Sequence, residues 1–328
     1  MSALFTNLKG QLASYKNSAI KRHFSRCKDV QSYERALSFL RRHIEQKSER
    51  IYYDYGVADA LARLNHRPST VYERLRLRLK AWYHDGDKRF SHVAGLVNKM
   101  VMRPKVEKLG VPMPELYFCD RDVTDLDIDA LPESFVAKPH NGADSKGVLV
   151  MNGDLDKLSG RKYDRKSPLF KDFVRQYVLK AAGTNAYTKV MVEEFIVDSL
   201  QPDLVPLDYK AHCYGGKVIF FQVINRNKGQ RSQSFYARDW RRLDHVIDDY
   251  EPGKRIPEPK CLDELLMYAD RIASDVKQMM RLDFYITPKG PMFGEFTTYP
   301  AAGRNFSTYG NALSIQSWEV YPDEPSLY

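Results

Sequence analysis

The sequence predicts a protein of the α+β class, in which helices are interspersed with antiparallel hairpins. Two segments, residues 208–225 and 280–304, have the aromatic and branched runs and the glycine turns of hairpins. Apolar residues recur at helical spacing in residues 262–280, directly before the second hairpin. The first 85 residues contain further helical stripes and no strand-like alternation. We therefore expect a helical extension ahead of a mixed core.

This extension, residues 1–88, is the first of three predicted parts. The chain has a formal net charge of +9, and about eleven more basic than acidic groups lie in its first hundred residues. Such basic helix faces are either solvated or bind an anionic partner, for which a membrane or a polyanionic glycan is expected and nucleic acid is not. The positions predicted for this contact are Lys21, Arg22, Arg26, Arg74 and Arg78.

Composition excludes several classes of protein. With 43% hydrophobic and 28% charged residues, the chain reads as an ordinary globular protein. No apolar run approaches the roughly 18 residues that span a bilayer, and no secretory leader is recognised, so we expect a cytoplasmic protein, with contact at the inner face of the membrane if the basic helices bind there. The four cysteines are widely spaced, which indicates neither a disulfide framework nor a zinc site.

After the extension, the pattern predicts a helix over residues 92–109 that ends at Gly110. Pro104 lies inside this helix, where we expect a kink or a break. A short strand over residues 115–119 follows. Further along, residues 152–188 are basic and helical, and residues 226–243 are polar and rich in arginine.

Residues 134–151 read as a strand, a polar glycine-containing loop and a second strand. Lys138 and Lys146 flank the loop, and its exposed backbone N–H groups suit a triphosphate. It is not a Walker A loop, because Val148 stands where that motif has lysine. A plain hairpin is the alternative. We expect His140 to be a solvated bystander rather than a catalytic acid.

The hairpin at residues 280–304 carries the clearest chemical signal. If it is centred on Lys289, Asp283 and Glu295 lie directly opposite each other, with Cβ atoms roughly 5 Å apart. Two facing carboxylates repel unless a cation lies between them, and their hard oxygens suit Mg²⁺. The alternative is a hairpin whose outer face is merely polar and solvated.

Period-2 alternation assigns the two faces of this hairpin. The predicted core face contains Leu282, Phe284, Ile286, Met292 and Phe296. The predicted site face contains Arg281, Asp283, Tyr285, Glu295 and Thr297.

The order of these pieces resembles the ATP-grasp superfamily, and most closely its teichuronopeptide-biosynthesis branch, which occurs among surface-polysaccharide proteins. The resemblance runs from about His92 to the C-terminus. It implies two α+β subdomains that close on ATP, over residues 89–197 and 198–328, with ATP and Mg²⁺ as cofactors.

The resemblance also implies individual roles. In NKMVMRPKVEKLGVPMPELY, Lys99 would be the first nucleotide lysine, and in FVAKPHNGADSKGV, Lys138 would bind the α- and β-phosphates. VEEFI resembles the hinge, where Glu193 would accept from the adenine amine and the backbone at Glu194 and Ile196 would pair with the ring. The implied cofactor-binding set is Lys99, Lys138, Lys146, Glu193, Glu194, Ile196 and Lys210.

The motif DYK at residues 208–210 resembles the teichuronopeptide branch in particular. RLDFY and GEFT resemble the two metal-ligand strands, so the implied metal ligands are Asp283, Glu295 and Thr297. Thr297 stands where most members have asparagine, and its hydroxyl reaches a metal only weakly or through water. No Rossmann-like unit precedes the core, so the acceptor-binding part is not identified.

The resemblance implies a carboxylate-amine ligase that works through an acyl phosphate, on a small-molecule or polysaccharide carboxylate and an amine. Arginines would bind the acyl phosphate or the substrate carboxylate. Two alternatives stay open: a phosphotransferase acting on a sugar hydroxyl, and a polyanion-binding protein with a regulatory nucleotide site. The candidate arginines are Arg226, Arg231, Arg281 and Arg304.

Overall fold

The computed structural model describes residues 68–83, 93, 95–142, 146–181, 187–227, 229 and 231–320. The chain divides into two units, Met1–Arg67 and Pro68–Tyr328, and the first lies outside the described residues. The expected helices before residue 68, with Lys21, Arg22 and Arg26, therefore lie outside them as well. Among the helices that the structure describes, none combines the length and the apolar character needed to cross a membrane.

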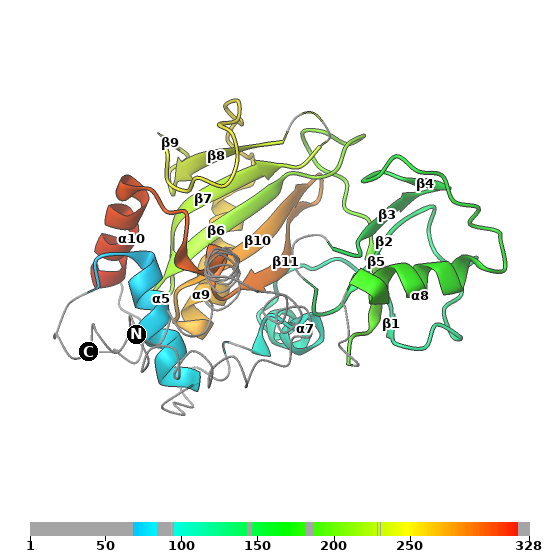
Figure 1. Cartoon of the computed structure of the whole chain (residues 1–328). Coiled ribbons are helices and arrows are strands. Elements are labelled where there is room, and N and C mark those ends of the chain that lie inside the picture. Colours follow the sequence, from blue (N-terminus) through cyan, green and yellow to red (C-terminus); the bar gives the residue numbers. More distant parts are fainter. Residues whose placement is uncertain are drawn as a thin grey trace, which may run out of the picture. The chain divides into compact units, whose positions relative to one another are not determined.

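Five antiparallel strands form a first sheet, called sheet A, in the order β1-β5-β2-β3-β4 (Figure 1). Helix α8, Phe170–Ala181, packs against one face of it through Phe170, Val174 and Val178. The strands are β1 Leu116–Asp120, β2 Ser134–Pro139, β3 Leu149–Asn152, β4 Leu155–Asp156 and β5 Val190–Glu194.

Alternation along β2 and β5 separates the two faces of sheet A. Phe135 and Ala137 of β2 are buried against α8, so Lys138 points to the opposite face. In β5, Val192 is buried in the same cluster and Glu193 points to the face that carries Lys138. Sheet A thus has one apolar face and one face with charged side chains.

Six antiparallel strands form a second sheet, sheet B, in the order β11-β10-β6-β7-β8-β9. Both predicted hairpins are confirmed, with β6 and β7 joined through Gly215-Gly216 and β10 and β11 joined through Pro288-Lys289. The strands are β6 Asp208–Tyr214, β7 Lys217–Asn225, β8 Ser232–Ala237, β9 Arg242–Leu243, β10 Met280–Thr287 and β11 Gly290–Thr297.

The predicted helix before the second hairpin is confirmed as α9, Leu262–Val276, and its buried stripe of Leu265, Ala269 and Ile272 packs on sheet B. Helix α7, Lys99–Lys108, joins the same core through Met102 and Val106. It continues through Pro104, so no break occurs there, although the helix is shorter than the predicted range.

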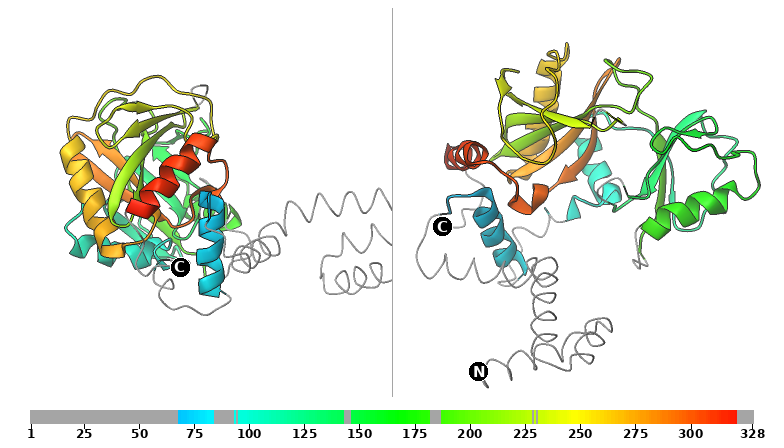
Figure 2. Two further views of the ribbon diagram at one scale, coloured as in Figure 1. Left: turned by 90° about the vertical axis from the view of Figure 1, so that its left-hand side faces the viewer. Right: turned by 45° about the horizontal axis from the view of Figure 1, so that its top comes forward.

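The opposite face of sheet B is covered by two helices, α5 (Val71–Tyr83) and α10 (Thr308–Val320), as the left view of Figure 2 shows. Val71 and Leu75 of α5 and Trp318 of α10 share an apolar cluster with strands β6 to β9. The described part of the predicted extension is therefore built into the core. The three-part division at residues 88 and 197 stays a prediction.

Arg74, Arg76 and Arg78 of α5 do not form an outer face, and the prediction of a solvated or anion-binding surface is wrong for them. Arg74, Arg76 and Arg78 are 9%, 3% and 0% exposed. Arg76 donates to Ala302 O at 2.8 Å, and the Arg74 guanidinium lies 4.7 Å from the centre of the Trp318 ring. Guanidinium groups can be buried where carbonyls and aromatic rings receive them.

Candidate active site

The hairpin of β10 and β11 brings Asp283 and Glu295 together as predicted, because they are direct partners in the antiparallel register. The turn is fixed by Thr287, whose Oγ1 donates to Gly290 O at 2.9 Å and accepts from Lys289 N at 3.0 Å. Gly290 has a φ of 112°, which side chains rarely adopt. The local sequence thus sets the register that pairs the two carboxylates.

A β-bulge at Gly294 interrupts the predicted alternation. Asp283 pairs with Glu295, but the next residue, Phe284, pairs with Phe293, so Gly294 is the extra residue. A Cβ at Gly294 would lie 2.9 Å from the Tyr285 ring, which explains the glycine. Because of the bulge, Phe293 is in the core, and the prediction that Met292 is a core-face residue is wrong: it pairs with Tyr285.

Asp283 lies between two cations. Lys210 Nζ donates to its Oδ2, and Arg281 binds both of its oxygens, with N–O distances of 2.6 and 2.8 Å. Burial acts to raise the pKa of Asp283, but Arg281 and then Lys210 outweigh it, so the pKa lies well below its ordinary value. Asp283 is therefore a permanently charged acceptor at neutral pH.

Asp208 extends the charged cluster along β6. It lies 3.5 Å from Lys210 Nζ and accepts from Arg226 Nε at 2.6 Å. Burial acts to lower the pKa of Arg226, whereas Asp208 raises it, with further contributions from Tyr250 and Tyr285, and the net change is upward. Asp208, which the sequence pointed to only as part of DYK, thus holds Lys210 and Arg226 in place.

Glu295 contacts a different lysine. Lys99 Nζ lies 3.0 Å from Glu295 Oε2, and 3.4 Å from the carbonyl oxygen of Gly142 in the predicted phosphate loop. Lys99 is the first residue of α7, whose start is fixed because the Asn98 side chain accepts from Met100 N at 3.0 Å. A buried lysine therefore joins the hairpin to the loop after β2.

His140 connects the same loop to sheet A and is not solvated, contrary to the prediction. It is 6% exposed, its Nδ1 accepts from Lys189 N at 3.0 Å, and its carbonyl accepts from Lys99 N at 3.2 Å. Burial first, and then Lys189 and Lys99, lower its pKa. It is a neutral structural residue that anchors Lys99.

On sheet A, Lys138 and Glu193 form an ion pair on the charged face, with the Lys138 side chain 14% exposed and that of Glu193 7% exposed. Lys146 is exposed. At the predicted hinge, Ile196 is buried, and the Glu194 N–H already donates to Glu115 O at 2.8 Å. The nucleotide roles of these residues stay predictions.

Tyr285 shows that the charged faces of the two sheets come near one another. Burial raises its pKa well above the ordinary value, and Asp208, Glu295 and Glu193 raise it further. Two of these carboxylates belong to sheet B and the third to sheet A. Glu295, a predicted metal ligand, and Glu193, the predicted adenine-binding carboxylate, therefore act on the same phenol.

Not every predicted residue belongs to this cluster. The Arg304 guanidinium lies 5.7 Å from the centre of the Tyr72 ring of α5, and that of Arg231 lies 4.9 Å from the Tyr250 ring. Thr297 pairs with Arg281 across the hairpin, two positions from Glu295 along β11. Of the four candidate arginines, Arg226 and Arg281 are the two whose described ion pairs are with carboxylates of this cluster.

His212 and Gln222 were not predicted. His212 is fully buried, pairs with Arg281 in the register, and stacks on Phe220 with ring centres 4.2 Å apart. Burial lowers its pKa to about 3, and Arg281 acts in the same direction. Gln222 pairs with Lys210 and lies 3.5 Å from His212 Nε2 through its Oε1. A polar side chain inside a strand of aromatic residues was the available signal.

A family model described as TupA-like ATPgrasp matches residues 78–311, about seven tenths of the chain. The chain belongs to the TupA-like ATPgrasp family. The ATP-grasp resemblance, its teichuronopeptide branch and the α+β fold class are thereby confirmed. No curated protein matches this TupA-like chain.

Solved structures similar to this TupA-like ATP-grasp protein include three enzymes of low identity. D-Alanine-D-alanine ligase from Helicobacter pylori is 18% identical, with a TM-score of 0.40, over 68% of this chain and 61% of that one. VanG D-Ala:D-Ser ligase from Enterococcus faecalis is 14% identical, with a TM-score of 0.47, over 70% and 62%. Biotin carboxylase from Campylobacter jejuni is 10% identical, with a TM-score of 0.42, over 68% and 44%. The chain thus spans about three fifths of the two ligases.

ATP-grasp proteins use ATP, usually with Mg²⁺. The donor set of this TupA-like chain fits both groups: Asp283 and Glu295 supply hard oxygens from facing strands, and Lys99 and Lys210 contact the same two carboxylates. Within the described residues no three His, Cys, Asp or Glu side chains gather as a metal cage. A Mg²⁺ ion here would therefore depend on phosphate and water for its other ligands, which is its habit in nucleotide sites.

Proposed function

We propose that this chain is an ATP- and Mg²⁺-dependent ligase that joins a carboxylate to an amine through an acyl phosphate. The observation that carries the proposal is the pairing of lysines with carboxylates at one site: Lys210 with Asp283 and Lys99 with Glu295. When ATP and Mg²⁺ bind, the phosphates can replace the carboxylates as partners of the lysines, and the metal can replace the lysines as the partner of the carboxylates. Attachment of an amino acid or another amine to a surface polysaccharide or its precursor is the substrate proposal, and it rests on the sequence resemblance.

In the first half of the reaction, a substrate carboxylate oxygen attacks the γ-phosphorus of ATP, and ADP leaves. The protein positions the two reactants and offsets charge, and forms no covalent bond itself. Lys99, Lys138 and Lys210 are the residues that would contact the phosphates. Their burial strengthens each contact, because the local dielectric is low.

Asp283 and Glu295 would hold Mg²⁺, which supplies charge neutralisation and orientation of the phosphates when bound. Both carboxylates have cationic partners, so their negative charge is compensated in the protein alone. This balance explains how two carboxylates can face each other without a large electrostatic cost. It also supports an exchange of partners, lysine to phosphate and carboxylate to metal.

In the second half, the amine nitrogen attacks the carbonyl carbon of the acyl phosphate, and phosphate leaves. Planar guanidinium groups suit the carboxylate and the phosphoryl oxygens of this intermediate. Arg281 and Arg226 are the best-supported candidates, because their carboxylate partners Asp283 and Asp208 both contact Lys210. The contact described for Arg304 is with the Tyr72 ring.

Trapping with hydroxylamine tests this proposal. The wild-type chain, ATP, Mg²⁺ and a panel of uronic acids and amino acids should give a hydroxamate together with ADP and free phosphate. A phosphorylated sugar without released phosphate would instead establish a kinase. ATP binding without turnover of any panel member would favour the regulatory alternative.

A further inference from the structure

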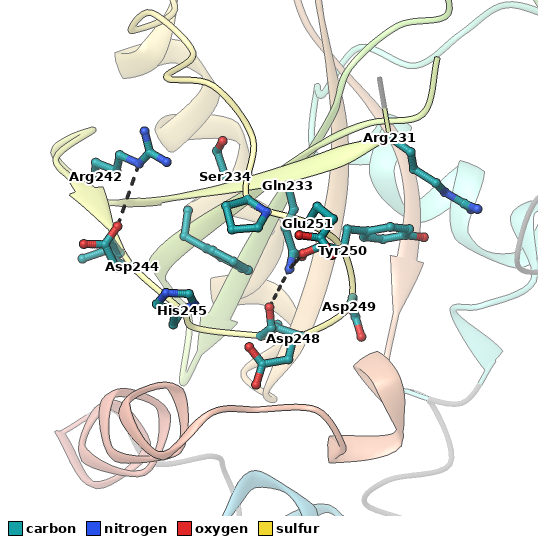
Figure 3. Close-up of a pocket in the computed structure, with 14 residues that line it drawn as sticks. Arg231, Gln233, Ser234, Arg242, Asp244, His245, Asp248, Asp249, Tyr250 and Glu251 are labelled. Carbon is teal, nitrogen blue, oxygen red and sulfur yellow. Dashed lines mark hydrogen bonds and ion pairs between the residues drawn. The ribbon is translucent and has the colours of Figure 1, made fainter. Parts of the chain in front are cut away.

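A pocket of about 550 Å³ lies at the edge of sheet B, away from the hairpin of Asp283 and Glu295 (Figure 3). Strands β8 and β9 contribute one wall, and the loop of residues 244–252 contributes the other. This volume lies within the range of small-molecule sites. Of the residues that the sequence predicts to bind substrate, Arg231 lines the pocket.

The loop wall is fixed to the sheet by one buried side chain. Gln233 is 5% exposed, and its Nε2 donates to Ile247 O at 2.6 Å and to Tyr250 O at 2.8 Å. Its backbone N–H donates to Glu251 O at 2.9 Å. From the other side, Asp248 N donates to Asn305 O at 2.8 Å. The pocket therefore has a preformed shape, as a binding site requires.

The same glutamine links the pocket to the charged cluster. Gln233 Oε1 accepts from Gln222 Nε2 at 2.8 Å, and Gln222 pairs with Lys210 in the register. Asp208 and Gln233 both pair with Ile224, so their Cα atoms are two strand spacings apart, about 10 Å. A ligand in the pocket would lie within molecular reach of the phosphate-transfer site.

The charges of the pocket differ from those of the chain as a whole, which carries +9. Arg231 and Arg242 are its two guanidinium groups, and Arg231 lies against the Tyr250 ring at 4.9 Å while Arg242 lies 3.9 Å from Asp244. Four carboxylates outnumber them, so the lining has a formal charge of −2 with His245 neutral. The carboxylates are Asp244, Asp248, Asp249 and Glu251.

Two of the four carboxylates, Asp248 and Glu251, are available to a ligand. The other two have partners: Asp249 accepts from Asn305 Nδ2 at 2.8 Å, and Asp244 faces Arg242. Asp248 and Glu251, by contrast, have side chains that contact no ion-pair or hydrogen-bond partner in the part of the chain that the structure describes. Asp248, Glu251 and Tyr250 all line the pocket, and carboxylates and aromatic faces both attract an ammonium group.

We propose that this pocket binds the amine acceptor as an ammonium ion, held by Asp248 and Glu251 beside Tyr250. The proposal rests on the proposed ligase function, and it adds a place and a charge preference for the second substrate. An amino sugar and an amino acid share this chemistry. Arg231 is the group that would meet a carboxylate on the acceptor, if it carries one.

Ligand-observed NMR on the full chain without ATP tests the binding step. The probes are glucosamine and glycinamide, each compared with its N-acetylated form. At least one amine should bind at least tenfold more tightly than its acetylated partner, because acetylation removes the charge. Preference for glucosamine would indicate an amino-sugar acceptor, and preference for glycinamide an amino acid. Equal binding of both pairs would overturn the proposal.

The double variant Asp248→Asn with Glu251→Gln should abolish the preference for the amine. Asp239→Asn with Glu258→Gln removes the same charge at exposed positions outside the pocket, and should keep it. An unchanged preference in the pocket variant would refute the assignment. Hydroxylamine trapping separates the two ideas: hydroxamate without selective amine binding refutes the pocket alone, and selective binding without hydroxamate refutes the ligase alone.

Discussion

Arg78 of helix α5 and Arg281 of strand β10 are both largely shielded from water, but they bind different partners. Arg78 is 0% exposed and donates to two carbonyl oxygens, to Met279 O at 2.8 Å and to Thr298 O. Arg281 instead binds the carboxylate of Asp283 with both N–O contacts under 3 Å. A carbonyl stays where the backbone puts it, whereas a carboxylate can exchange its cation for a metal.

This difference distinguishes an arginine that binds backbone carbonyls from one that binds a predicted metal ligand. Met279 immediately precedes β10, and Thr298 immediately follows β11, so Arg78 ties the open end of the β10–β11 hairpin to α5. The Tyr299 ring lies against its guanidinium at 4.6 Å. Arg281 lies within the hairpin itself. The first arginine holds the hairpin, and the second takes part in its charge balance.

The largest effect is expected at the carboxylates. Glu295→Gln and Asp283→Asn should each lower ATP turnover roughly thousandfold, because each removes a charge that faces Mg²⁺. Their stabilities should differ. Asp283→Asn leaves Lys210 and Arg281 buried without their carboxylate and should cost about 3–5 kcal/mol, not stabilise the metal-free protein as simple repulsion between carboxylates would suggest.

Glu295→Gln should destabilise the protein less than Asp283→Asn, because the Glu295 side chain is 36% exposed and one buried cation, Lys99, loses its carboxylate instead of two. ADP release and urea unfolding on the same two variants measure both quantities. Full turnover in both would remove the metal site from this hairpin. Equal unfolding free energies would mean that the cations around Asp283 find other partners.

His212 lies at the boundary between the two regions, stacked on Phe220 of the apolar cluster and paired with Arg281. Its pKa is about 3 in the folded protein, against about 6.5 unfolded, so only the unfolded state binds the proton between these values. The contribution of His212 to the free energy of unfolding should therefore be fully present above pH 6.5. Below that pH, the free energy of unfolding should fall by about 1.4 kcal/mol per pH unit.

Urea unfolding of wild type and His212→Phe between pH 7 and 5 measures this slope. The variant should lose most of it, because phenylalanine keeps the stacking and cannot titrate. Asp283 does not interfere in this range, since its lowered pKa matters only below about pH 4. An equal slope in both proteins would assign the acid sensitivity to other groups.

Arg78→Met should destabilise the protein with little effect on ATP turnover. The variant leaves the carbonyls of Met279 and Thr298 unpaired in a buried position, which should cost about 2–4 kcal/mol. Residual ATP turnover at saturating Mg²⁺ should stay within tenfold of wild type, in contrast to the carboxylate variants. Arg241→Met is the matched control, because that side chain is 70% exposed, and its unfolding should not change. Loss of turnover in a folded Arg78→Met protein would place Arg78 in the chemistry.

The sequence predicts the parts of the site that depend on local spacing. Asp283 and Glu295 are paired because a short turn determines the register, and Lys210 is where the DYK motif and the Gly215-Gly216 turn suggested. Both arguments use residues less than twenty positions apart. The register of a hairpin is largely decided within the hairpin.

What the sequence does not reveal depends on distant partners. The basic stripe of α5 resembles a solvated face, and only the carbonyls of Met279 and Thr298, 201 and 220 residues away, make Arg78 a core residue. His140 is buried by Lys189 in the same way. Strand β8 lies in residues 226–243, which the sequence indicated only as polar and arginine-rich, and helix α10 was not predicted. Tertiary burial overrides composition in each case.

The bulge at Gly294 makes the length of the hairpin adjustable. Because this glycine is unpaired, deleting it would leave Glu295 opposite Asp283 and Phe293 opposite Phe284, with every side chain on its present face. Deletion is thus a gentler change than substitution, since an added Cβ would meet the Tyr285 ring at 2.9 Å. Only the extra twist that a bulge gives to its strand would be lost. Gly294 therefore affects the direction of the Glu295 side chain, and its deletion should preserve the pairing of β10 with β11.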